Sequence, residues 1–68
     1  MTHKEFTDIA SSIPVEPGIY KYYNVTNELL YVGKAKNLRK RVGSYFSRTF
    51  TSYKTHELVK RIHHIEFT

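Results

Sequence analysis

The sequence has no cysteine among its 68 residues, and its apolar runs are only a few residues long. Without cysteine, neither a disulfide nor a thiolate metal site can stabilise the fold, and the absence is compatible with a reducing compartment. A membrane span needs roughly 20 consecutive apolar residues, so no membrane partner is expected. The first sixteen residues contain acidic side chains and no hydrophobic segment, unlike a secretory signal. We therefore expect a cytoplasmic protein.

Acidic residues are scarce. Six of them stand against eleven lysines and arginines, which gives a net charge of +5 and an isoelectric point near 9.6. Five basic residues fall within the run 34–41, which has no acidic residue. Such a patch attracts a polyanion such as a nucleic acid, and the ten tyrosines and phenylalanines offer stacking surfaces. By itself, the charge run is equally typical of a solvated face.

The local pattern predicts an α+β fold. Residues 3–12 are weakly helical, and two prolines end that segment. β-branched and aromatic residues predict strands over 18–23 and 29–33, joined by a turn. Apolar spacing predicts helices over 36–46 and 53–63, the second capped by Ser52, with a polar loop over 47–52. A third strand begins at Ile65.

These elements form a single domain over residues 1–68, a small three-stranded antiparallel sheet flanked by helices. Residues 1–16 are expected to form an N-terminal helix and linker, and residues 17–68 the core. The third strand stops after four or five residues without a terminator. We therefore expect the chain to be the N-terminal part of a longer protein.

The predicted hairpin gathers tyrosines on one face of the sheet. A four-residue loop over 24–27 places Tyr20 opposite Tyr31 and Tyr22 opposite Leu29. Because side chains alternate along a strand, the three tyrosines then share a face. A slip of one residue would send Tyr31 to the opposite face.

The helix predicted over 36–46 adds cations to this region. At about 100° per residue, Lys34 and Arg41 point within about 20° of each other if the helix begins early enough to include Lys34. Both would then border the packed face. The other basic residues of the run would point outward: Lys36, Arg39 and Lys40.

The triplets Gly18-Ile19-Tyr20 and Tyr31-Val32-Gly33 resemble the signature of the GIY-YIG nuclease superfamily, with valine in place of the second motif's isoleucine. The continuation over 34–46 is similar to the N-terminal endonuclease domain of the UvrC family, the incision subunits of bacterial nucleotide excision repair. The resemblance runs from about Pro17 to the end of the chain.

This resemblance implies an enzyme, a metal-dependent DNA endonuclease that cuts the damaged strand on the 3′ side of a lesion. It implies one divalent cation, Mg²⁺ or Mn²⁺, and DNA, UvrA and UvrB as partners. The family's catalytic positions fall on Tyr20, Tyr31, Lys34 and Arg41. DNA contact and shaping of the site are expected of Gly33, Lys36, Arg39, Lys40 and Tyr45.

The family's metal-holding glutamate matches no residue of this chain. It would lie beyond Thr68, and Glu66 stands too early to replace it. A later asparagine of the family is missing as well. No metal ligand is therefore assigned here, and the chain by itself is expected to be inactive.

Phosphodiester hydrolysis needs a deprotonated, aligned water and neutralised phosphate charge. A tyrosine, with a reference pKa near 10, is a poor base unless an ammonium or a metal ion stabilises its phenolate. We expect Tyr31 to take the proton, helped by Lys34, while Tyr20 holds the water or phosphate and Arg41 clamps the phosphate. The two tyrosines could exchange roles.

Two other functions fit the sequence. One is a different GIY-YIG nuclease, of the structure-specific, homing or restriction type, which the lysine-rich continuation disfavours. The other is a noncatalytic basic module that binds nucleic acid. In that case the tyrosines would be packing residues of a strand, and Lys34 and Arg41 ordinary solvated charges.

Overall fold

One antiparallel sheet and three helices make up the described parts of the chain, residues 1–46 and 52–68 of a computed structural model. Residues 47–51 of the predicted loop lie outside the described residues. The elements are α1 (His3–Ala10), β1 (Gly18–Tyr23), β2 (Leu29–Ala35), α2 (Leu38–Tyr45), α3 (Tyr53–Arg61) and β3 (His64–Phe67). The sheet order is β2-β1-β3, so the predicted α+β class and three-stranded antiparallel sheet are confirmed.

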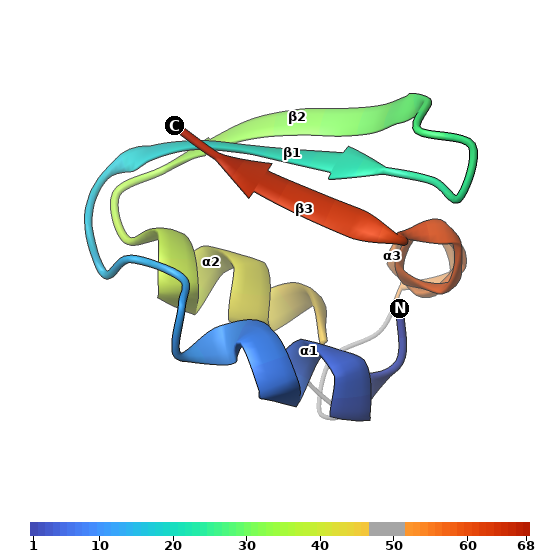
Figure 1. Cartoon of the computed structure of the whole chain (residues 1–68), viewed down its shortest axis with the longest axis horizontal. Coiled ribbons are helices and arrows are strands. Elements are labelled where there is room, and N and C mark those ends of the chain that lie inside the picture. The colour runs from blue at the N-terminus through green and yellow to red at the C-terminus, as the bar shows by residue number, and fades with distance from the viewer. Residues whose placement is uncertain (47–51) are drawn as a thin grey trace.

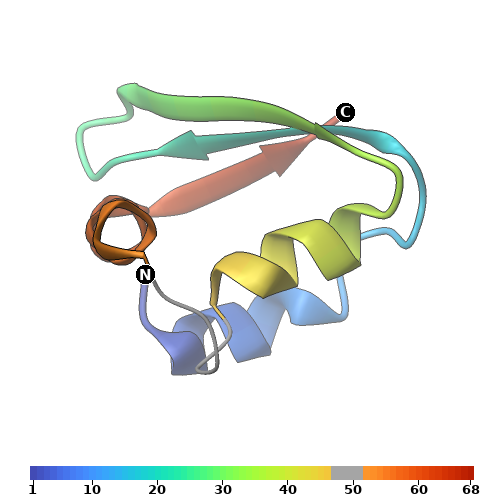
Figure 2. The same ribbon diagram turned by 180° about the vertical axis from the view of Figure 1, so that it is seen from behind.

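The helices lie on one side of the sheet. In Figure 1, α2 runs beneath the strands with α1 beside it, and α3 stands at the end near the β1–β2 turn. Figure 2 shows the same two layers from behind, with α2 nearer the viewer than α1. The core fills the space between the layers and consists of Phe6, Ile13, Tyr20, Tyr22, Leu38, Val42, Phe46, Ile62 and Ile65. No helix of the described residues is both long and apolar enough to cross a membrane.

The N-terminal segment belongs to this core. Thr2 and Glu5 form a capping box at the start of α1, in which each side chain accepts from the other's backbone nitrogen. Phe6 then stacks on Phe46 with ring centroids 4.4 Å apart, and Ile13 is fully buried. The expected N-terminal helix is present, but the prediction that residues 17–68 form the core left out these two core residues.

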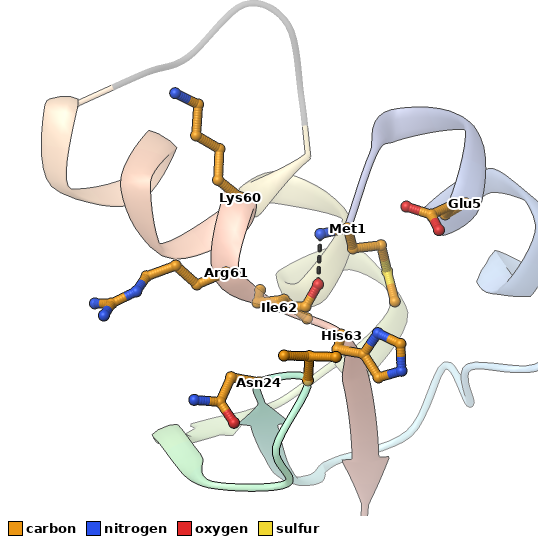
Figure 3. A pocket seen from close by; sticks show the side chains of 8 residues that line it. Met1, Glu5, Asn24, Lys60, Arg61, Ile62 and His63 are labelled. Atoms are coloured by element: carbon orange, nitrogen blue, oxygen red, sulfur yellow. Dashed lines mark hydrogen bonds between the residues drawn. The ribbon is translucent and has the colours of Figure 1, made fainter.

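A hollow of about 450 Å³ lies where α1, the end of α3 and the β1–β2 loop meet (Figure 3). There the nitrogen of Met1 donates hydrogen bonds to the carbonyls of Val59 and Ile62. These bonds tie the start of α1 to the last turn of α3. Lys60 and Arg61 extend in different directions in Figure 3, so their charges do not converge on the hollow.

The hairpin register differs from the predicted one. Tyr20 lies opposite Gly33, and Tyr22 lies opposite Tyr31. The predicted Tyr20–Tyr31 and Tyr22–Leu29 pairs were therefore wrong by two residues. Because the side-chain period of a strand is two, the three tyrosines nevertheless share one face, as expected.

Two one-residue irregularities add up to this shift. The loop closes one residue later than predicted, with the nitrogen of Asn24 donating to the carbonyl of Glu28 at 3.0 Å. The Asn24 side-chain oxygen accepts from the nitrogens of Thr26 and Glu28, and Asn27 adopts a left-handed φ of 66°. A bulge beside Tyr22 then adds the second residue.

Helix α2 begins later than predicted, because Asn37 caps it. The Asn37 side chain accepts from the nitrogen of Lys40 at 3.0 Å. Lys34 consequently lies on β2, so the condition for its alignment with Arg41, a helix that includes Lys34, is not met. The predicted apolar positions of this helix, Leu38, Val42 and Phe46, are buried.

The C-terminal elements follow the prediction closely. Ser52 caps α3 by accepting from the nitrogen of Thr55 at 3.1 Å. The helix ends at Arg61, two residues early, and β3 begins at His64, one residue early. Ile65 of β3 is buried opposite Tyr22 of β1, so the third strand closes the core from the far side of β1.

Candidate active site

Four tyrosines from three elements meet on the helix-covered face of the sheet. This tyrosine cluster comprises Tyr20 and Tyr22 of β1, Tyr31 of β2 and Tyr45 of α2. Every pair of its rings has centroids between 5.2 and 6.4 Å apart. Tyr20 and Tyr22 are buried, whereas Tyr31 is 42% exposed. Tyr45 is partly buried, so Tyr31 is the most exposed member of this packed cluster.

Hydrogen bonds join Arg41 to the cluster. The hydroxyls of Tyr20 and Tyr45 lie 2.9 Å apart, and Nε of Arg41 donates to the Tyr20 hydroxyl at 3.5 Å. The Arg41 guanidinium carbon also lies 5.5 Å from the centre of the Tyr45 ring, within cation–π range. The bond to Tyr20 raises the pKa of Arg41 above its usual value, so the guanidinium keeps its charge.

Burial keeps two phenols of the cluster protonated, those of Tyr22 and Tyr45. It raises the pKa of Tyr22 well above 10, because a phenolate there would be desolvated. The pKa of Tyr45 is also raised, first by burial and then by its hydrogen bond with Tyr20. Tyr22 and Tyr45 are therefore neutral hydrogen-bonding groups at neutral pH.

Gly33 makes room for Tyr20. A Cβ atom at residue 33 would lie 2.3 Å from both Cζ and the hydroxyl oxygen of Tyr20, far inside van der Waals contact. The Tyr20 ring therefore lies directly across the β2 backbone at Gly33, its cross-strand partner. Gly33 of the second triplet thus leaves the space that the ring of Tyr20 of the first triplet occupies.

A basic groove adjoins the cluster. It is an open hollow of about 570 Å³ whose lining includes Lys34, Lys36, Lys40, Arg41 and Ser44. A second hollow, of about 190 Å³, is lined by Arg41, Ser44, Tyr45 and Thr55. Because both share Arg41 and Ser44, the basic groove continues from the lysines to the edge of the tyrosine cluster. Four of the five cations of the run 34–41 line it.

Lys34 lies away from Tyr31, contrary to the prediction. They lie three positions apart along β2, which places them on opposite faces of the strand. Within residues 1–46 and 52–68, no hydrogen bond joins Lys34 to a tyrosine. The predicted help from Lys34 to Tyr31 is therefore not supported, and Lys34 instead lines the basic groove with Arg41.

Arg39 is exposed, as predicted, but its side chain also binds the backbone. Its Nε donates to the carbonyl of Ile13 at 2.8 Å, and its Nη2 donates to the carbonyl of Ser11 at 3.1 Å. The segment between α1 and β1 has carbonyls that no regular element pairs, and Arg39 satisfies two of them. Its observed role is to hold that segment against α2.

Sequence reasoning missed three residues of the site. Tyr22 was placed on the correct face but assigned no role, although its spacing of two from Tyr20 indicated a shared environment. Ser44 and Thr55 line the hollow beside Arg41. No local signal identifies them, because they come together only when α2 and α3 pack.

A divalent cation is not accommodated by the described residues alone. They contain no group of three or more histidine, cysteine, aspartate or glutamate side chains that could hold a metal ion. Glu66 lies opposite Lys21 on the other face of the sheet and contacts His64 at 3.2 Å. A carboxylate for a metal at the tyrosine cluster would have to come from outside residues 1–46 and 52–68.

Comparison with known proteins decides the family. Residues 16–68 match the family described as the UvrC-like GIY-YIG domain. The chain belongs to this family.

Its curated relatives include UvrABC system protein C of Cytophaga hutchinsonii, 41% identical over 66 residues, and that of Actinobacillus pleuropneumoniae, 50% identical over 58 residues. These matches cover 96% and 85% of the chain but only 11% and 10% of the relatives' own lengths.

Solved UvrC-like GIY-YIG domains share the fold. The N-terminal endonuclease domain of UvrC from Thermotoga maritima, bound to its catalytic magnesium, superposes with a TM-score of 0.78 at 26% identity. The match covers 96% of this chain and 70% of that one. Variants of the Thermotoga domain with single tyrosine-to-phenylalanine substitutions also hold the catalytic cation.

Proposed function

We propose that this UvrC-like GIY-YIG domain hydrolyses a DNA phosphodiester on the 3′ side of a lesion, as the incision domain of a longer UvrC-type protein. The observation that carries the proposal is the hydrogen-bonded group of Arg41, Tyr20 and Tyr45, beside the exposed phenol of Tyr31 and at the end of the basic groove. A fixed cation and an accessible phenol are what a phosphate and its attacking water require.

The proposed roles follow from exposure and hydrogen bonding. Tyr31, the accessible phenol, takes a proton from the attacking water as its phenolate. The water oxygen bonds to phosphorus, and the bond from phosphorus to the leaving sugar oxygen breaks. The leaving oxygen takes a proton from solvent water, and Tyr31 returns its proton to solvent. Arg41 uses its remaining N–H groups to bind the phosphate, and Tyr20 positions Arg41 and Tyr45.

The basic groove is the proposed path of the DNA backbone. Lys34, Lys36 and Lys40 line it and would neutralise phosphates next to the cleaved one. Each phosphate contact contributes to affinity through counterion release, without reading sequence. Recognition of the lesion is accordingly assigned to the proposed partners UvrA and UvrB.

The proposal extends to the cellular setting. A UvrC-type incision domain would act in the cytoplasm during nucleotide excision repair, as part of the SOS response to DNA damage. It would use Mg²⁺ or Mn²⁺, with a carboxylate ligand from outside the described residues. The 68-residue chain alone is expected to bind DNA without cutting it.

Incision of a lesion-bearing duplex by the complete protein tests this proposal. Tyr31→Phe should abolish 3′ incision, while Tyr53→Phe, a substitution on the exposed side of α3, should leave it unchanged. Arg41→Ala should lose incision and retain DNA binding through the lysines of the basic groove. Unchanged incision by Tyr31→Phe would refute the assigned role.

The same assay separates the two alternatives. A noncatalytic binding module would show no incision even with the complete protein and a divalent cation. A GIY-YIG nuclease of another kind would cut without UvrA and UvrB. Incision that depends on both partners supports the UvrC-type function.

A further inference from the structure

Tyr22 has a buried hydroxyl with no partner. Within the part of the chain that the structure describes, the Tyr22 hydroxyl oxygen is the one buried side-chain polar atom that lacks a hydrogen-bond partner. The residue is 0% exposed, so water does not reach the hydroxyl. Such groups are rare because they cost free energy that a phenylalanine would avoid, and a functional role is one explanation.

The ring of Tyr22 contacts all three other members of the tyrosine cluster. Its centroid lies 5.3 Å from that of Tyr20, 6.3 Å from that of Tyr31, and 5.2 Å from that of Tyr45, which it meets edge-on. Tyr31 is also its cross-strand partner. The unpaired donor is thus part of the same packed unit as the phenols that the proposed reaction uses.

The reaction needs a donor at this place. Before it takes the proton of water, the phenolate of the general base carries negative charge, which a preorganised donor stabilises. Lys34, the donor expected from the sequence, lies on the other face of β2. Arg41 directs its Nε to Tyr20. Because burial raises the pKa of Tyr22, its hydroxyl stays protonated and can serve as the donor.

We propose that Tyr22 is a positioning residue whose hydroxyl donates a hydrogen bond to the phenolate of Tyr31 while that phenolate awaits the proton of water. This inference rests on the function proposed above. By stabilising the phenolate, Tyr22 increases its population near neutral pH, where a free phenol would be almost fully protonated.

Tyr22→Phe removes only the hydroxyl. Tyr23→Phe makes the same change at the next residue, whose ring lies against His64 on the other face of the sheet, and is the matched control. Incision by the complete protein would be measured from pH 6 to pH 10, together with DNA affinity and urea unfolding. Tyr22→Phe should shift the rise of incision to higher pH, with about tenfold slower incision at neutral pH for a shift of one pH unit.

The other readouts separate positioning from simple packing. The proposal expects unchanged DNA affinity, unchanged or greater stability, and recovery of incision at high pH for Tyr22→Phe, with no change for Tyr23→Phe. A purely structural Tyr22 would alter stability and leave the pH profile where it was. That result would overturn the inference and leave the proposed nuclease function intact.

A titration of the tyrosine phenols tests the inference even if the wild-type protein does not cut DNA. Carbon-13 labels on the tyrosine rings report by NMR the pH at which each phenol loses its proton. The ring of Tyr31 should lose its proton at higher pH in Tyr22→Phe than in the wild type or in Tyr23→Phe. An identical titration of Tyr31 in all three proteins would refute the inference without any activity measurement.

Discussion

Gly33→Ala is expected to displace Tyr20 and so to destroy the proposed active site. The added Cβ would lie 2.3 Å from two atoms of the Tyr20 side chain, whereas real Cβ contacts essentially never fall below 3.0 Å. The ring must therefore retreat by at least about 0.7 Å to restore that separation. Among the described residues no glycine has a positive φ, so the effect is steric and does not reflect a strained backbone.

Tyr20 has no free space into which to retreat. It is 1% exposed and packs against Tyr22 and Tyr45, so moving it breaks the 2.9 Å hydrogen bond to Tyr45. Overpacking of a core costs about 1–3 kcal/mol, and a lost hydrogen bond about 0.5–1.5 kcal/mol. We expect the free energy of unfolding to fall by roughly 2–4 kcal/mol and incision to fall on the order of a hundredfold.

Gly43→Ala is the matched control. A Cβ atom at residue 43 in α2 would lie 3.7 Å from Phe6, which is an ordinary contact. Replacing a helical glycine by alanine should stabilise the protein by about 0.5–1 kcal/mol and leave incision unchanged. Urea unfolding and incision of a lesion-bearing duplex measure both variants. Wild-type stability and incision in Gly33→Ala would refute the close approach of Tyr20 to residue 33.

Three further predictions concern stability, each measured by urea unfolding. Arg39→Ala should lower the free energy of unfolding by about 1–3 kcal/mol, because two hydrogen bonds to the segment before β1 are lost, and Lys40→Ala should not. Asn24→Ala should cost about 1–2 kcal/mol, since its side-chain oxygen accepts hydrogen bonds that close the hairpin. Hydrogen bonds from Thr2 lower the pKa of the Glu5 carboxyl below 4.5. The ionised carboxylate therefore stabilises the fold above that pH, and this stabilisation is lost on further acidification. Glu5→Gln should accordingly remove the part of the fall in unfolding free energy between pH 5 and pH 3 that Glu5 causes.

The tyrosines show how far periodicity alone can carry a prediction. The alternation of β1 placed Tyr20 and Tyr22 on one face without reference to any other strand. The pairing of β1 with β2 was wrong by two residues, because the Asn24 loop and the bulge each added one. Tyr31 still faces the cluster, because side chains alternate along a strand and two one-residue shifts together leave a side chain on its original face. An error of one residue in the pairing would have placed Tyr31 on the opposite face of the sheet, away from the site.

The basic run shows where local reasoning fails. Its charge predicted a polyanion-binding surface, and four of its five cations line one groove. The fifth, Arg39, binds backbone carbonyls of a segment more than twenty residues earlier. Nothing in the run distinguishes Arg39 from Lys40, because the difference arises from which carbonyls the packed chain leaves unpaired.

The amino-acid sequence determined the order and type of the elements, the common face of the three strand tyrosines and the family. All of these depend on periodicity and on neighbouring residues. The tertiary structure decided which side chains touch: Tyr45 and Arg41 on Tyr20, Lys34 away from Tyr31, and a buried hydroxyl at Tyr22. Such contacts depend on distances between segments distant in the chain, and angstrom-scale packing sets these distances.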